Sequence, residues 1–168
     1  GGARIEALAL DAAAADALGP DRRLDATLST RTVSTEGAML EALTARAEGA
    51  LSALGLRVET TGEANGEPVS LAATATLDAR AEAPVLRVSR LDAGYAEEEA
   101  SLNAPFTVTA GDATSVSGLD LALPDGRLAG DATLYPGGIE ADIELALGDL
   151  GIAARLADAG ILGAMAVF

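Results

Sequence analysis

Apolar and polar residues alternate with a period of two along much of the chain. Between Ile139 and Leu147 every odd position is aliphatic, and Glu140, Asp142 and Glu144 stand among them. Successive side chains of a β-strand point to opposite faces, so this alternation predicts a strand with one wet face and one dry face. The same pattern recurs at residues 24–29, 56–61, 69–78 and 101–109.

Turn-forming residues separate these runs at short intervals. Asn65-Gly66 is a strong hairpin signal because both residues tolerate a positive φ. The segments 124–126 (Pro-Asp-Gly) and 135–138 (Tyr-Pro-Gly-Gly) combine a fixed φ with permissive ones. Short strands joined by hairpins predict an antiparallel meander of about ten strands.

Two places disturb the alternation. Pro105 lies inside the run 101–109, where it cannot donate a ladder hydrogen bond, so we expect a bulge or a sheet edge there. Arg87 and Arg90 fit poorly into the alternation of their apolar neighbours. We expect both arginines to pair with surface carboxylates, which contributes little to stability.

Three segments favour or permit a helix. Asp11–Leu18 is rich in Ala and is followed by Gly19-Pro20, which predicts a short helix with a stop signal. Asp149–Ala159 has a similar character and also precedes a glycine. Met39–Leu54 fits helical spacing and strand alternation alike; local propensity favours a helix, and Gly49 weakens it.

The apolar faces of the predicted strands must be shielded from water. Each has one apolar face, and two short helices are too small to cover ten such faces. Either the sheet folds back into a sandwich or barrel, or part of the apolar face stays lined but open. Ten strands at about 4.8 Å spacing would form a trough on the order of 45–50 Å long.

The composition limits the kinds of molecule that the protein can bind. Hydrophobic residues make up 49% of the chain but aromatic ones only 2%, which fits either codon bias or an aliphatic interior. The net charge of −15 disfavours binding to nucleic acid and to anionic lipid headgroups. A lipid bound by this protein would therefore be held by its tails.

The chain lacks the residue types that most enzyme mechanisms use. The chain has no His and no Cys, and Arg is its only basic residue. Nucleophile–histidine pairs, zinc sites, Walker A loops and Schiff-base amines are therefore excluded. Glu97-Glu98-Glu99 lacks the spacing of a calcium loop and indicates a solvated turn. Paired-carboxylate glycosidase chemistry has no aromatic platform for a sugar, so we expect no enzyme and no cofactor.

Two stretches carry a family resemblance. Leu24–Leu77, and Val116–Leu150 with its strand RLAGDATL at 127–134, resemble the repeat texture of the TamB family of AsmA-like proteins, in its alphaproteobacterial form. The resemblance covers most of the chain and rests on texture, without a catalytic signature. No N-terminal membrane anchor and no closing aromatic strand is present. We therefore expect residues 1–168 to be a single internal β-groove segment of a longer, repetitive protein.

The resemblance implies a fold and a function. TamB-like proteins are anchored in the inner membrane and span the periplasm as long, curled antiparallel sheets with a hydrophobic groove, a β-taco. They are linked to phospholipid transport toward the outer membrane and to the assembly of outer-membrane proteins with an Omp85-type partner. Here Met39–Leu54 should form two strands with a break near Gly49. The groove is then expected at alternating apolar positions: Leu56, Val58, Val69, Leu71, Leu77, Leu102, Phe106, Val108, Leu119, Leu121, Leu128, Leu134, Ile139, Ile143 and Leu145.

One alternative stays open. A closed β-solenoid or sandwich, such as part of a bacterial surface adhesin, would satisfy the same apolar stripe internally. A closed core leaves no apolar surface, whereas an open groove must recruit lipid, detergent or another copy of the chain. Unpaired sheet edges would also recruit partners, so we expect end-to-end self-association.

Overall fold

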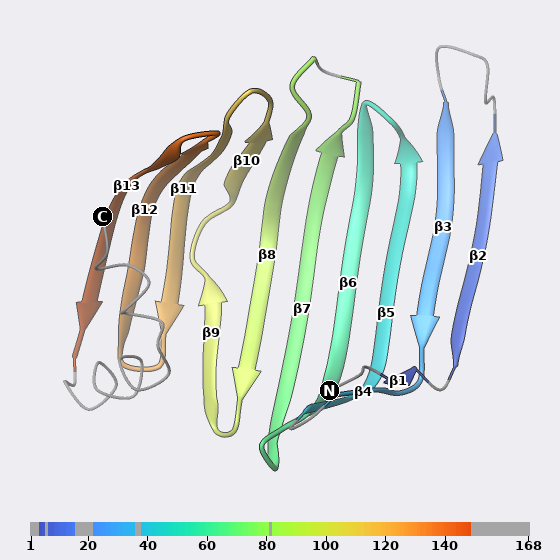
Figure 1. Ribbon diagram of the computed structural model, residues 1–168, viewed down its shortest axis with the longest axis horizontal. Coiled ribbons are helices and arrows are strands. Elements are labelled where there is room, and N and C mark those ends of the chain that lie inside the picture. Colours follow the sequence, from blue (N-terminus) through green and yellow to red (C-terminus); the bar gives the residue numbers. More distant parts are fainter. Residues whose placement is uncertain (1–3, 6, 16–21, 36–37, 81, 149–168) are drawn as a thin grey trace.

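The structure, a computed structural model, describes residues 4–5, 7–15, 22–35, 38–80 and 82–148. These residues form one antiparallel sheet of 13 strands and contain no helix. In Figure 1 the long strands from β2 to β8 lie side by side in one layer. The expected all-β class and antiparallel sheet are confirmed. The strands are β1 (Arg4–Ile5), β2 (Leu8–Ala15), β3 (Arg23–Thr30), β4 (Val33–Thr35), β5 (Ala38–Ala50), β6 (Ala53–Ala64), β7 (Glu67–Asp78), β8 (Val85–Tyr95), β9 (Glu98–Leu102), β10 (Phe106–Ala110), β11 (Thr114–Leu123), β12 (Gly126–Tyr135) and β13 (Gly138–Leu147).

Three pairs of strands each share one position across the sheet. β9 and β10 both lie between β8 and β11, and β3 and β4 both pair with β5. β1 and β2 continue the outer side of that pair, because β1 pairs with β4 and β2 with β3 in the same register. The described strands therefore fill ten positions, which we call lanes. The number of described strands is 13 and exceeds the ten or so expected, because three lanes are each divided between two strands.

One corner of the sheet bends sharply. Figure 1 shows β1 and β4 lying crosswise at the lower end of β3, β5 and β6. Beside them the register of β5 with β6 shifts between Leu40 and Ala42, so Glu41 is a bulge. Gly62 of β6 lies opposite, and a Cβ added there would come within 2.2 Å of the Met39 carbonyl oxygen. The corner therefore needs a residue without a side chain at position 62.

A second bulge explains the misfit of the two arginines in β8. The partner of Thr74 is Arg90 and the partner of Ala75 is Val88, so Ser89 is the extra residue. The Ser89 hydroxyl donates a hydrogen bond to the Thr74 carbonyl oxygen over 3.3 Å. The bulge moves the apolar positions of β8 from even to odd numbers and keeps them on one face.

Pro105 lies in the break between β9 and β10. Ser101 pairs with Asp92 and Phe106 pairs with Val88, so the broken strand uses one residue more than β8 over the same span. The expected run 101–109 is thus divided in two. The extra residue agrees with the expected bulge, and the alternative of a sheet edge is wrong because β8 and β11 flank the break.

The helix predicted at Asp11–Leu18 is wrong over its described part. Asp11–Ala15 belongs to β2, which pairs with β3 from Leu8 to Ala15 without a shift. Alanine favours a helix only weakly, and pairing with a neighbouring strand overrides that preference. The helix predicted at Asp149–Ala159 lies outside the described residues.

The ambiguous segment Met39–Leu54 forms strands. It contributes most of β5 and the start of β6, with the turn at Leu51 and Ser52. The break near Gly49 is therefore confirmed, and the helical alternative is wrong. Gly49 itself has a φ of 123°, a region that favours glycine.

Little of this sheet is enclosed. Among the described residues the buried apolar side chains are Leu54, Ala75 and Val88, all in the middle lanes. A closed sandwich of this length would bury many more, because each inner strand face would pack against a second layer. No second layer is present in the part of the chain that the structure describes.

Candidate apolar face

Strand pairing sorts the side chains into two faces. Directly paired residues of antiparallel strands point to the same side. One row runs from Leu56 through Ala75 and Val88 to Phe106, and it is apolar throughout. We call the side that carries this row the apolar face and the other side the polar face.

All of the groove positions expected from sequence lie on the apolar face. Leu71 pairs with Thr60, Val69 with Tyr95, Leu102 with Leu121, and Leu128 with Leu145, each in register with that row. The others on this face are Leu56, Val58, Leu77, Phe106, Val108, Leu119, Leu134, Ile139 and Ile143. The register places them on one surface and does not by itself say what that surface binds.

Further apolar residues on this face were not recognised from sequence. Leu8 and Leu10 of β2 were concealed by the Ala-rich run that resembles a helix, although they pair with Thr30 and Leu28. Leu43 and Leu91 follow bulges, which shift the alternation by one position. Two adjacent polar residues inside a strand, such as Ser89-Arg90, are the signal that could have revealed the shift.

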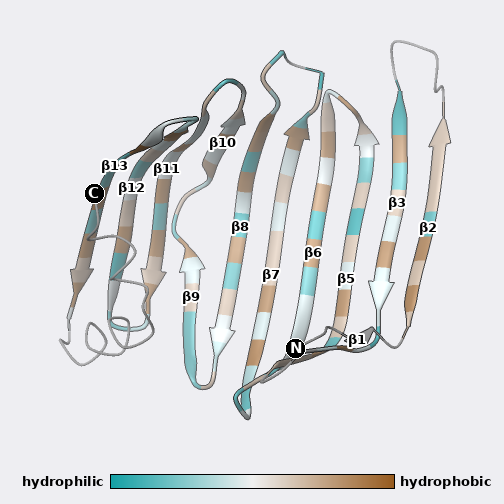
Figure 2. Cartoon of the chain, viewed as in Figure 1, coloured by the Kyte–Doolittle hydropathy of each residue, from teal (hydrophilic) through white to brown (hydrophobic). Residues whose placement is uncertain are grey.

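The apolar face carries almost no charge. Among its described strand positions only Glu67 and Glu98 are charged, and both stand at the first residue of a strand, β7 and β9. Figure 2 shows the resulting alternation as hydrophobic and hydrophilic bands along the strands. The centre of the face is therefore a continuous, uncharged and mostly aliphatic surface.

The exposure of the aliphatic side chains on this face increases toward its two sides. Leu54 and Val88 in the middle are 5% and 8% exposed. At the outer lanes, Leu10 of β2 is 69% exposed and Ile143 of β13 is 42% exposed. Side chains in the middle are shielded by neighbours on both sides within the same layer, whereas those of the outer strands lack one neighbour.

One hydroxyl on the apolar face is unsatisfied. Thr30, between Leu8 and Leu43, is 7% exposed, and its Oγ1 has no hydrogen-bond partner among the described residues. Thr60 differs, because its hydroxyl donates to the Ala42 carbonyl oxygen over 2.8 Å beside the Glu41 bulge. Thr30 is therefore a local defect in the apolar face, whereas the hydroxyl of Thr60 is satisfied.

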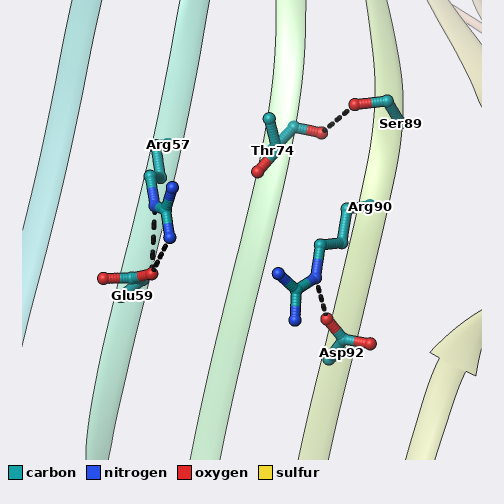
Figure 3. Close-up of polar contacts among 6 residues, drawn as sticks. All are labelled: Arg57, Glu59, Thr74, Ser89, Arg90 and Asp92. Carbon is teal, nitrogen blue, oxygen red and sulfur yellow. Dashed lines mark hydrogen bonds and ion pairs between the residues drawn. The ribbon is translucent and has the colours of Figure 1, made fainter.

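Ion pairs lie on the opposite, polar face. Arg57 and Glu59 approach to 2.6 Å and Arg90 and Asp92 to 2.5 Å, each pair within one strand, as Figure 3 shows. The second pair agrees with the expectation for Arg90. These side chains are 42% to 63% exposed, so the pairs contribute little to stability.

A denser cluster supports the break between β9 and β10. Asp120 of β11 accepts hydrogen bonds from Arg127 Nε at 2.7 Å and from Asn103 Nδ2 at 3.0 Å. The Asn103 backbone N–H also donates to the Asp120 carbonyl oxygen over 2.9 Å. The hydrogen bond from Arg127, followed by that from Asn103, lowers the pKa of Asp120 from 3.8 to about 2. The carboxylate thus remains charged and holds the interrupted strand against β11 and β12.

A third bulge lies in β11 at Ser117-Gly118. The register with β12 shifts between Val116 and Leu119, and Gly118 has a φ of 74°. Its backbone N–H, freed from the ladder, donates to Asp131 Oδ1 over 2.6 Å. An acidic residue of the polar face therefore satisfies the bulge, and the apolar positions on both sides of it stay on one face.

Two hollows in the described part of the chain are lined mainly by polar or exposed residues. One of about 470 Å³ is lined mainly by polar-face residues, including Arg46, Arg57 and Thr74. Another of about 340 Å³ lies beside Glu97-Glu98-Glu99, which are all exposed. Of these, Glu97 lies in the turn, whereas Glu98 and Glu99 begin β9. Within the described ranges no three acidic residues are grouped as a metal site would require.

Comparisons with known proteins give no relative. No protein-family model, no curated protein and no solved structure matches the chain. Among the residues that the structure describes, no helix has the length and apolar character needed to cross a membrane. The face itself is therefore the basis for a functional hypothesis.

Proposed function

We propose that the apolar face binds lipid acyl chains, and that the protein is a non-enzymatic surface for phospholipid transport or outer-membrane assembly. The observation that carries this proposal is an aliphatic face across ten lanes, without a charged strand residue in its centre and without a covering layer in the described ranges. At about 4.8 Å per lane the face is on the order of 45 Å wide. An extended acyl chain fits within that width.

The chemistry of the face favours tails over headgroups. Each methylene transferred from water onto an apolar surface contributes up to about 0.8 kcal/mol when fully buried. The centre offers no charged anchor, and the Thr60 hydroxyl there is already engaged with the Ala42 carbonyl oxygen, so a chain would bind without headgroup specificity and could slide. The net charge of −15 and the two glutamates at strand ends, Glu67 and Glu98, disfavour anionic headgroups on the surface itself.

The resemblance to TamB-like proteins supplies the cellular setting of the proposal. On that basis the protein acts in the periplasm, within a longer chain anchored in the inner membrane. An Omp85-type outer-membrane partner would be contacted by regions of that longer chain outside residues 1–168. The resemblance concerns repeat texture, and the apolar face is independent support for the lipid part of the proposal alone.

A closed scaffold is the competing function. In a β-solenoid or sandwich the apolar residues would be enclosed, as in an adhesin segment. The part-exposed state of Leu134, Ile139 and Ile143, between 42% and 52%, favours the open face instead. An enzyme is disfavoured by the chain's lack of His, Cys and Lys.

Mass spectrometry of an organic extract from detergent-free protein tests the proposal. We expect phospholipid in near-stoichiometric amount, and its loss from a variant with Leu71→Asp, Phe106→Asp and Ile143→Asp. The matched control carries Ser70→Asp, Thr107→Asp and Thr133→Asp, which place the same charges on the polar face. The control should retain lipid, because its substitutions leave the apolar face unchanged.

The outcomes separate the two functions. A clean extract, together with no uptake of added fluorescent phospholipid by the folded protein, would mean that the chain is a closed scaffold. Equal lipid loss from both variants would assign binding to overall charge and not to the apolar face. Circular dichroism of each variant confirms that the strand content is retained before lipid is measured.

A further inference from the structure

We propose that copies of this chain join edge to edge, with β2 of one copy pairing antiparallel with β13 of the next. Both outer strands invite such pairing. β2 (eight residues) and β13 (ten residues) contain no proline and pair with their inner neighbours without a register shift. Edge strands are usually protected by prolines, bulges or lysines, because unpaired backbone groups recruit other strands.

The number of lanes sets the direction of the joint. Every neighbouring pair is antiparallel, so across ten lanes β2 and β13 run in opposite directions. A second copy in the same orientation therefore presents its β2 antiparallel to β13 of the first. The apolar faces of the two copies then lie on the same side and form one continuous surface.

Among the described residues, the backbone N–H and C=O groups that have no ladder partner at the two edges belong to apolar-face residues. The Arg31 N–H donates to the Ala7 carbonyl oxygen, so the odd-numbered residues of β2 form the hydrogen-bonded pairs with β3. The backbone N–H and C=O groups of Leu10, Ala12 and Ala14 therefore point away from β3, toward the outer edge. The Gly148 N–H donates to the Asp125 carbonyl oxygen, so in β13 the odd-numbered residues point outward. A ladder between the edges thus pairs apolar residues with apolar residues.

Charge selects the register. β13 carries Glu140, Asp142 and Glu144 on its polar face, and β2 carries Asp11 there. Like charges directly opposite each other destabilise a strand pair. The longest pairing in which Asp11 faces no carboxylate begins with Leu10 opposite Leu147 and ends with Ala15 opposite Asp142.

In this register the side chains also match in size. Ala12 lies opposite Leu145 and Ala14 opposite Ile143, so small residues face large ones. Asp11 lies opposite Ala146. Pairing of β13 with β13 would oppose two acidic rows, and pairing of β2 with β2 would leave β13 unpaired. The joint between β2 and β13 pairs Leu10–Ala15 with Asp142–Leu147 and so uses both edges of each internal copy.

Disulfide trapping tests the joint in the full chain. The chain has no cysteine, so every crosslink formed is an engineered one. In the proposed register Ala13 lies opposite Glu144 in a non-hydrogen-bonded pair, whose Cα atoms are about 4.5 Å apart and within disulfide range. The double variant Ala13→Cys, Glu144→Cys should convert from monomer to a ladder of linked copies on mild oxidation at high salt. High salt is needed because it screens the repulsion between chains of net charge −15.

A matched control distinguishes the register. The double variant Ala13→Cys, Glu140→Cys removes a carboxylate in the same way but requires Asp11 to face Asp142, so it should remain largely monomeric. Equal ladders from both variants, a dimer from Ala13→Cys alone, an intramolecular disulfide or no crosslink would each overturn the proposal. Unmodified protein that sediments at 16.7 kDa at every concentration and salt level would overturn it as well. Lipid extraction does not depend on this joint, so failure here leaves the proposed function to its own test.

Discussion

At the residue scale, a few polar groups hold the irregular places of an otherwise uniform sheet. Asp120, Asn103 and Arg127 support the break between β9 and β10, and Asp131 satisfies the freed N–H of Gly118. These carboxylates lie on the polar face, where solvent reaches them. Thr30 is the exception, a buried hydroxyl on the apolar face without a partner among the described residues.

Replacing Thr30 by valine should stabilise the protein. Valine keeps the shape of threonine and removes a hydroxyl that is buried without a hydrogen bond to any described residue, a defect that costs about 1–3 kcal/mol. Leu8 and Leu43, its cross-strand partners, provide apolar neighbours for the new methyl group. Urea unfolding should show a higher midpoint with an unchanged slope. As a control, Thr60→Val removes a satisfied hydroxyl and should lower the midpoint.

The pKa of Asp120 should respond to Arg127 and to no other arginine. The folded pKa of about 2 lies below the ordinary value of 3.8, so charged Asp120 favours the folded state above pH 3.8. That stabilisation is lost as the pH falls from 3.8 toward 2. Arg127→Gln should raise the pKa of the Asp120 carboxyl, measured by NMR titration. Arg57→Gln should leave it unchanged; a pKa of Asp120 that is the same in both variants would contradict the assigned cause.

At the element scale, bulges keep the apolar residues together. The shifts at Glu41, Ser89 and Ser117-Gly118, and the extra residue around Pro105, each change the alternation between even and odd positions. Without them one end of each affected strand would present its polar residues to the apolar face. Bulges also increase local twist, which agrees with the expected curl of the sheet.

Replacing Gly62 or Gly118 by alanine should lower the stability of the protein, for a different reason in each case. In Gly62→Ala the new Cβ would meet the Met39 carbonyl oxygen at 2.2 Å, so the backbone at the corner must move, at a cost of roughly 1–3 kcal/mol. Gly118→Ala meets no atom within 4 Å and loses only its permissive φ of 74°, which costs about 1 kcal/mol. Urea midpoints should therefore rank the unmodified protein first, then Gly118→Ala, then Gly62→Ala. The reverse order of the two variants would mean that the corner is more adaptable than its geometry implies.

At the scale of the whole molecule, one question dominates: what covers the apolar face. Ten lanes in a single layer cannot shield their own aliphatic side chains, and only three apolar residues in the described ranges are buried. Lipid tails would cover the exposed side chains of the face, whereas strand pairing would cover the exposed backbone groups at its edges. The first removes side chains from water, and the second satisfies backbone groups.

The sequence by itself determined most strands and the face on which their side chains lie. Period-two alternation is a local property, so runs such as 56–61 and 139–147 reveal their dry face without knowledge of any partner. The hairpin at Asn65-Gly66 was equally local. Every groove position named from these runs lies on the apolar face in the strand register.

Only the tertiary structure decided which ambiguous segments are strands, where the bulges lie and whether the apolar face is covered. Leu8–Ala15 is a strand because β3 offers a matching ladder, a contact that an Ala-rich sequence does not announce. The bulge at Ser89 exists because β7 and β8 must both present apolar residues to one side, a condition set by two strands together. The absence of a second layer over the described sheet likewise belongs to no single segment. Alternation specifies which side of a strand is apolar, whereas pairing and packing between distant segments specify where that side lies and whether it is covered.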